Sequence, residues 1–178
     1  GMLGEELLII QKEFDGWVET RERLDLLAID KQGNLVIIEN KLDDSGRDVV
    51  WQSLKYAAYC STLAKSEIIS VYQKYLGSEA NLAEENLASF LGEEDLSVAG
   101  LNEGAGQRII LCAANFRPEV TATCLWLIDH GIDIRCKKIT PFSNGDSIFL
   151  SVEQVIPPPE AQDFMVKVGQ KKIGEQKS

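Results

Sequence analysis

Three short apolar runs near the start of the chain place the strongest limit on what it can fold into. They are LLIIQKEF at 7–14, RLDLLAID at 23–30 and LVIIENKL at 35–42, and residues of the Gly, Asn and Asp type lie between them. Runs of this length that are rich in aliphatic and β-branched residues and bounded by turn formers are typical of β-strands. The sequence therefore predicts that the chain opens with three consecutive strands.

The rest of the chain alternates between helical and strand patterns. Ser45 and Asp48 resemble a helix-capping pair, and residues 49–64 contain neither Pro nor Gly, which predicts a helix over about 46–64. Further helices are expected at 66–77, 80–91 and 118–130, and strands at 108–116, 132–140 and 147–156, with a turn at 141–146. The predicted fold class is α/β, in the form of a mixed sheet flanked by helices.

Composition and charge indicate how this fold is divided. The 178 residues are 44% hydrophobic and 26% charged, which is typical of a globular protein with one main core. We expect one domain over 1–156, followed by a linker or tail over 157–178. The formal net charge is -10, and residues 75–107 contain seven acidic and no basic residues. This acidity predicts a helical insertion over about 66–107.

Several classes of protein are excluded or disfavoured. The apolar runs have strand length and fall well short of the roughly 18 residues that a membrane span requires. No signal peptide is visible, so we expect a cytoplasmic protein. The four cysteines form no C-x-x-C pair and are expected to be buried free thiols. The single histidine, His130, precedes Gly131 at a predicted helix end, which leaves little basis for histidine-dependent catalysis.

Three charged residues interrupt the apolar strands and therefore need an explanation. They are Asp25, Glu39 and Lys41, and burying such groups without partners is costly. Side chains alternate along a strand, so Glu39 and Lys41 share one face. If residues 31–33 form a three-residue loop with Gly33 in the left-handed conformation, Asp25 falls opposite Glu39. A two-residue loop would place the two carboxylates on opposite faces.

The first of these two registers predicts a metal-binding site. Two carboxylates with a backbone carbonyl and water suit a hard divalent cation, so the expected ligands are Asp25, Glu39 and Asn40. Lys41 would then lie beside a water activated by the cation. On the following helix, Gln52 and Tyr56 are four residues apart, so they share a face and are expected to orient a water or a phosphate.

The stretch RLDLLAIDKQGNLVIIENKLDDSGRDVVWQSLKYAAYC resembles the PD-(D/E)XK nuclease superfamily, and within it the RecB-like groups with a Gln-x-x-x-Tyr motif. The resemblance implies a restriction-endonuclease-like core with a helical insertion before its fourth strand. It implies that Asp25, Glu39, Lys41, Gln52 and Tyr56 form the catalytic site. The implied activity is cleavage of DNA phosphodiester bonds with Mg²⁺ or Mn²⁺ as the cofactor.

The sequence departs from the family pattern in two places. Leu24 precedes Asp25 where the motif has Pro, a common relaxation. The resemblance also implies an upstream helix that carries another glutamate, whereas this sequence begins close to LGEELL. Three expectations follow and remain open: Glu5 or Glu6 substitutes for that glutamate, the chain is truncated, or the site is incomplete.

Two functional hypotheses follow from different classes of protein. The first is a metal-dependent nuclease of a DNA-processing, defence or repair system. The second is a non-catalytic module of the same fold that binds nucleic acid or protein, which leaves enzymatic activity undecided. The expected partner is DNA, and a homodimer and a protein partner at the acidic insertion are left open. The candidate phosphate contacts are Lys41, Lys55, Lys137 and Lys138.

Overall fold

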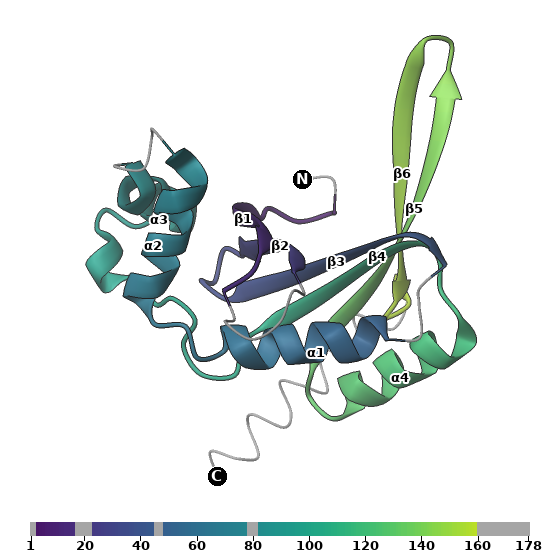
Figure 1. The fold of residues 1–178 in the computed structure, drawn as a ribbon, viewed down its shortest axis with the longest axis horizontal. Helices are drawn as coiled ribbons and strands as arrows, with labels where there is room; N and C mark the ends of the chain where they lie inside the picture. Colours follow the sequence, from purple (N-terminus) through teal and green to yellow (C-terminus); the bar gives the residue numbers. More distant parts are fainter. Residues whose placement is uncertain (1–2, 17–22, 45–47, 78–81, 160–178) are drawn as a thin grey trace.

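Six strands form one mixed sheet, in which the spatial order follows the chain order (Figure 1). The structure is a computed structural model, and it describes residues 3–16, 23–44, 48–77 and 82–159. The strands are β1 (Leu8–Phe14), β2 (Leu24–Ile29), β3 (Leu35–Asp44), β4 (Arg108–Asn115), β5 (Asp133–Asn144) and β6 (Ser147–Ile156).

The sheet combines antiparallel and parallel pairs. β1, β2 and β3 form an antiparallel meander, β3, β4 and β5 run parallel, and β6 is antiparallel to β5. The helices are α1 (Val49–Cys60), α2 (Lys65–Leu76), α3 (Ala83–Leu91) and α4 (Pro118–Asp129). This arrangement confirms the predicted α/β class and is consistent with a restriction-endonuclease-like core.

Alternating side chains divide the core between the two faces of the sheet. Leu35 and Ile37 of β3 contribute to the larger cluster, on the face that α1 and α4 cover in Figure 1. Val36 and Ile38 point the other way and join a smaller cluster, against which Leu3 and Leu7 pack. None of the described helices is long and apolar enough to cross a membrane.

The helix predicted over 46–64 is shorter in the structure. α1 ends at Cys60, and the side-chain amide of Asn102 donates hydrogen bonds to the carbonyls of Cys60 and Leu63, each at 2.9 Å. This contact satisfies carbonyls that a longer helix would use internally, which explains the early end. The predicted start at Ser45 lies outside the described residues.

The turn predicted over 141–146 is wrong. β5 continues to Asn144 and β6 begins at Ser147, so the connection is only two residues long. Gly145, with φ of +62°, is the first of these two residues, and such tight hairpins favour glycine there. Pro141 is tolerated in the strand because the pairing of β5 with β4 ends at Lys138, before it.

The predicted helical insertion is present between α1 and β4. It consists of α2, α3 and a short 3₁₀-helix, η2 (Leu96–Val98), and it lies to one side of the sheet (Figure 1). α3 ends before Gly92, as the sequence predicted, and Gly92 forms a left-handed cap with φ of +78°. All four cysteines are buried and free, which confirms that prediction. The domain boundary at 156 stays a prediction, and residues 160–178 lie outside the described part.

Gly33 should be among the positions least tolerant of substitution. Its φ is +81°, and a Cβ at this position would collide with the carbonyl oxygen of Gly100. We expect Gly33→Ala to lower the free energy of unfolding by more than about 2 kcal/mol, because the collision adds to the cost of the left-handed backbone. The matched control is Gly131→Ala, where φ is +86° but no atom lies nearby. Equal losses in urea unfolding would contradict this expectation.

Candidate metal-dependent site

Asp25 and Glu39 lie opposite each other on neighbouring strands. β2 and β3 pair with Leu26 opposite Ile38 and Leu27 opposite Ile37, so the register brings Asp25 to Glu39 one residue further on. The hairpin has the predicted three-residue loop, since the Asp30 amide donates to the Asn34 carbonyl at 3.1 Å. The predicted shared face of the two carboxylates is therefore confirmed.

The carboxylate of Glu39 is buried and only partly satisfied. The residue is 2% exposed, and its Oε1 accepts a hydrogen bond from Lys41 Nζ at 3.0 Å. Among the described side chains, its Oε2 is the buried oxygen that has no hydrogen-bond partner. Leaving such an oxygen unpaired is costly, so this atom indicates a missing ligand.

Burial also raises the pKa of the Glu39 carboxyl above its usual value. Hydrogen bonds from Lys41 and from the backbone N–H of Asp25 lower this pKa, whereas the negative charge of the Asp25 carboxylate raises it. Two influences therefore raise the pKa of Glu39: its own desolvation and its repulsion by the nearby carboxylate of Asp25. A cation between Asp25 and Glu39 would relieve this repulsion.

Asp25 is held against the backbone of β3. Its Oδ2 accepts a hydrogen bond from the amide of Asn40 at 2.6 Å. This contact places the carboxylate beside the peptide groups on either side of Asn40, including the carbonyl expected to act as a ligand. The side chain of Asn40 is on the opposite face, so any contribution of this residue comes from its backbone.

Gln52 of α1 reaches the same site. Its Oε1 lies 3.4 Å from Lys41 Nζ, which is within hydrogen-bond distance but long. Lys41 is thereby held between Glu39 and Gln52, with 31% of its side chain exposed. The structure thus brings together Asp25, Glu39, Lys41 and Gln52, as the sequence predicted.

Tyr56 does not occupy the position expected for it. The residue is 1% exposed, and its hydroxyl donates to the carbonyl of Arg23 at 3.2 Å. Tyr56 shares a helix face with Gln52. It lies one turn further along α1, however, where its side chain is part of the larger core cluster. The structure therefore favours a role in positioning the start of β2 and Asp25 over contact with a phosphate.

The donor set fits a small hard cation. The described residues contain no group of three or more Asp, Glu, His or Cys side chains suited to a metal. Two carboxylates and a backbone carbonyl, completed by water, are instead the kind of ligand set that Mg²⁺ prefers. Asp25, Glu39 and the carbonyl of Asn40 would hold such an ion. The ion would supply the partner that the buried Glu39 Oε2 lacks among the described residues.

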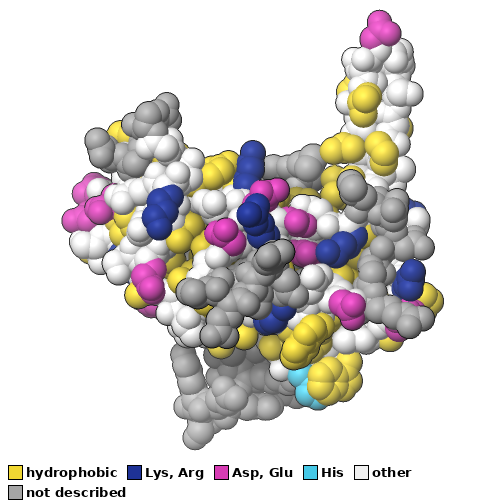
Figure 2. Space-filling view, in the orientation of Figure 1, with side chains coloured by type: hydrophobic (Ala, Val, Ile, Leu, Met, Phe, Trp, Pro, Cys, Tyr) yellow, Lys and Arg dark blue, Asp and Glu magenta, His cyan; other side chains and the backbone are white. Residues whose placement is uncertain are grey.

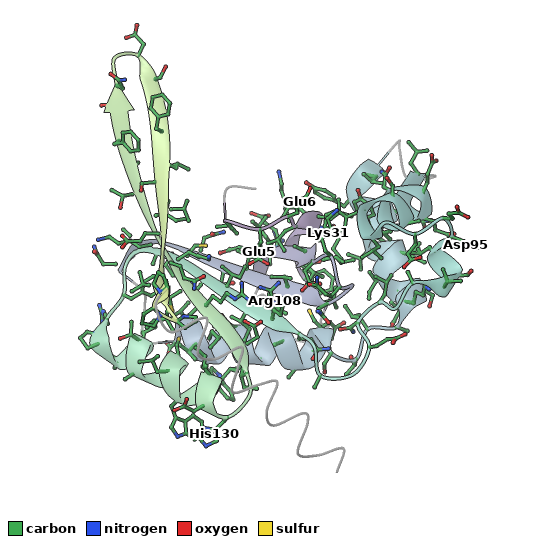
Figure 3. All side chains as sticks on the ribbon, turned by 180° about the vertical axis from the view of Figure 1, so that it is seen from behind. Glu5, Glu6, Lys31, Asp95, Arg108 and His130 are labelled. Carbon is green, nitrogen blue, oxygen red and sulfur yellow. The ribbon has the colours of Figure 1, made fainter. Side chains whose placement is uncertain are left out.

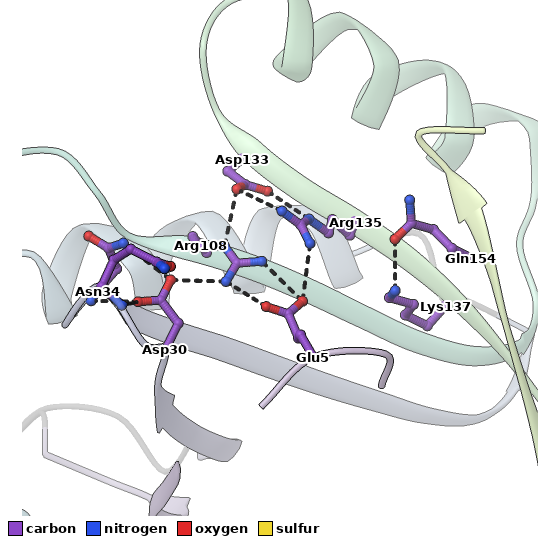
Figure 4. Close-up of polar contacts among 9 residues, drawn as sticks. Glu5, Asp30, Asn34, Arg108, Asp133, Arg135, Lys137 and Gln154 are labelled. Carbon is purple, nitrogen blue, oxygen red and sulfur yellow. Dashed lines mark hydrogen bonds and ion pairs between the residues drawn. The ribbon is translucent and has the colours of Figure 1, made fainter. Parts of the chain in front are cut away.

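Neither Glu5 nor Glu6 takes the place of the upstream glutamate that the family resemblance implies. Both oxygens of Glu5 accept hydrogen bonds from Arg108, at 2.8 and 3.1 Å (Figures 3 and 4). Glu6 lies 3.4 Å from Lys31, which follows β2 at the end of the hairpin away from Asp25 (Figure 3). The expectation that either glutamate joins the candidate site is therefore wrong.

The contacts of Glu5 belong to a polar cluster that the sequence analysis missed. Arg108 starts β4 and also donates to Asp30 at 2.9 Å and to Asp133 at 3.1 Å, while Arg135 donates to Glu5 at 3.1 Å (Figure 4). One signal for it was present, since Arg108 directly precedes the apolar run IILCA and must find partners there.

Of the adjacent lysines Lys137 and Lys138, only the second remains available to a phosphate. Lys137 is buried and donates to Gln154 at 2.7 Å, and burial lowers its pKa. Its predicted role as a phosphate contact is therefore wrong. Lys138 lies beside Ala113, which in turn lies beside Lys41, so it shares the face of the candidate site.

No family model matches the sequence, and no curated protein matches it. One solved structure, described as "Structure of EndoMS-dsDNA2 complex", matches with a TM-score of 0.35 and 14% sequence identity. The match covers 77% of this chain and 38% of the EndoMS chain. This chain thus spans well under half the length of the protein that it matches.

Proposed function

We propose that this chain is a metal-dependent nuclease domain that hydrolyses phosphodiester bonds of DNA at the face formed by Asp25, Glu39 and Lys41. The observation that carries the proposal is the unpartnered buried Oε2 of Glu39, which lies on the same sheet face as a second carboxylate and a lysine. A purely structural ion pair between Glu39 and Lys41 would not require a buried carboxylate oxygen without a hydrogen-bond partner.

In this proposal the two carboxylates of the site bind the cation. When bound, Mg²⁺ or Mn²⁺ supplies an acidified water and neutralises charge on a phosphoryl oxygen. Glu39 and Asp25 would hold the cation, and the hydrogen bond from the Asn40 amide fixes the orientation of the Asp25 carboxylate. The Asn40 carbonyl would complete the protein ligands.

Lys41 is placed to orient the attacking water and to stabilise negative charge in the transition state. Its Nζ lies 3.0 Å from Glu39 and 3.4 Å from Gln52, so it is held in place before substrate arrives. Such preorganised charges stabilise a transition state most effectively when they are partly shielded from water. Lys138, on the same face, is the second cation that a phosphate of the DNA backbone would meet.

The experiment is a cleavage assay on single-stranded, duplex and branched DNA with Mg²⁺ or Mn²⁺, compared with the same reactions in EDTA. We expect cation-dependent cleavage by the natural chain and a loss of at least about a hundredfold in Lys41→Ala, the range measured when one transition-state donor is removed. Lys74→Ala, which removes an exposed lysine from α2, is the control and should cleave normally. The proposal fails if no substrate is cleaved, or if Lys41→Ala cleaves as fast as the control.

A further inference from the structure

The outer halves of β5 and β6 form a hairpin arm, residues 139–152, that projects from the body of the molecule (Figure 1). Beyond Lys138 the pairing of β5 with β4 ends, so among the described strands the two strands of the arm pair only with each other. All residues from 140 to 151 are exposed. A two-stranded ribbon by itself is at best marginally stable in water, which indicates that the arm packs on a further surface.

The arm is apolar and almost free of charge. The rings of Phe142 and Phe149 stack across it with centroids 5.5 Å apart, and Ile148 is 80% exposed. Asp146, at the tip, is the one charged residue between 139 and 152. Figure 2 shows hydrophobic side chains along the arm and a single acidic group at its end. Scattered apolar side chains are normal on surfaces, but a concentration of this kind marks an interaction site.

An apolar strip connects the arm to the body of the sheet. Pro141 pairs with Leu150 and Ser143 pairs with Ile148, so these side chains share the face that does not carry the phenylalanines. Ile139 lies on the same face by strand alternation and packs against the smaller core cluster. A partner seated on this face would therefore extend the existing core.

β6 also presents a free edge. It is the last strand in the sheet and, within the described residues, it pairs only with β5. Over Ser147–Ile156 it contains neither proline nor lysine, and its single charge is Glu153. Natural edge strands are usually protected from pairing by such residues, so this edge is suited to accept another strand.

We propose that the arm and the edge of β6 bind the same surface of a second copy of this chain, with the two β6 strands antiparallel across a two-fold axis. In such an interface identical patches meet, so a single self-complementary surface is sufficient. The charge of the arm favours a second copy of this chain over a nucleic acid as the partner. A nucleic acid requires cations, and residues 139–152 contain none. Two chains of net charge -10 approach with least repulsion through an arm whose single charge is Asp146 at the tip.

Analytical ultracentrifugation of the natural chain tests the proposal independently of the catalytic site. We expect a species of twice the 19.7 kDa chain mass that dissociates on dilution. Ile148→Lys combined with Leu150→Lys should weaken the dimer by more than about a hundredfold, because the new like charges face each other across the axis. The matched control is Val98→Lys, which alters a residue that is 72% exposed on η2 and should leave the dimer intact.

A second variant tests the arm without adding charge. Thr140 and Ser151 pair directly, so an Asn-Gly turn in place of residues 141–150 shortens the hairpin and keeps its register. We expect this variant to show native circular dichroism and to be monomeric. A natural chain that is monomeric at millimolar concentration, or a shortened variant that still dimerises, would overturn the proposal. A monomer whose DNA binding depends on the arm would also overturn it and assign the arm to nucleic acid.

Discussion

Replacing Asp25 with asparagine and Glu39 with glutamine should reduce the rate of cation-dependent DNA cleavage by at least about a hundredfold. Removing a residue that only hydrogen-bonds to a metal ligand already lowers metal affinity or activity by about 10–100-fold, so removing two ligands should cost at least as much. Both substitutions preserve the shape of the side chain but remove the negative charge that a divalent cation requires. Initial rates at several Mn²⁺ concentrations measure the effect. High Mn²⁺ should restore only part of the rate.

A matched control separates loss of the site from a change in overall charge. Glu84→Gln with Asp129→Asn also removes two negative charges, and both residues are exposed on helices, α3 and α4. This control should cleave at the natural rate or slightly faster, since a less acidic chain repels DNA less. Equal rates for the site variant and the control would contradict the assignment of Asp25 and Glu39.

The site variant should not lose stability. Glu39 is buried with one unpaired oxygen, so removing its charge removes a desolvation cost. We expect its urea midpoint to equal or exceed that of the natural chain. A large decrease would instead show that the carboxylates stabilise the fold, and the loss of cleavage would then have a structural cause.

Among the substitutions considered, replacing Arg108 with leucine should lower the free energy of unfolding most, by about 3–5 kcal/mol. A loss of this size is typical when one partner of a buried ion pair is removed. The Arg108 side chain is 9% exposed and contacts Glu5, Asp30 and Asp133. Leucine would fill part of the volume but leave the Asp30 carboxylate, with 3% of its side chain exposed, without its cation. Urea unfolding followed by circular dichroism measures the loss.

Arg23→Leu is the matched control for this substitution. Arg23 forms an exposed ion pair with Glu13 at 3.1 Å, with 57% and 74% of the two side chains exposed. Such surface pairs contribute less than about 1 kcal/mol, so this variant should unfold near the natural midpoint. If the two leucine variants lose similar stability, the cluster around Arg108 does not have the importance assigned to it.

The sequence predicted the centre of the molecule better than its periphery. The opposition of Asp25 and Glu39 follows from the strict alternation of side chains once Gly33 defines the loop, so local rules were sufficient there. The arm was missed because a two-residue turn at Gly145 keeps residues 141–144 extended, although their composition is typical of a loop.

Long-range contacts account for the remaining differences. Glu5 and Arg108 are 103 residues apart in the chain, and no local pattern indicates that the N-terminal segment crosses β4. The contact of Asn102 with the end of α1 is likewise set by the tertiary fold. Helical spacing placed Tyr56 on the correct face of α1, but spacing alone does not predict how deeply a side chain is buried.

The central claim is that Asp25 and Glu39 hold a divalent cation, and calorimetric titration of Mn²⁺ tests it most directly. The natural chain and the Glu84→Gln, Asp129→Asn control should bind Mn²⁺ with the same affinity and heat. The Asp25→Asn, Glu39→Gln variant, correctly folded by circular dichroism, should show no saturable heat in the same range. Unchanged binding by that variant, or no binding by the natural chain, would contradict the account.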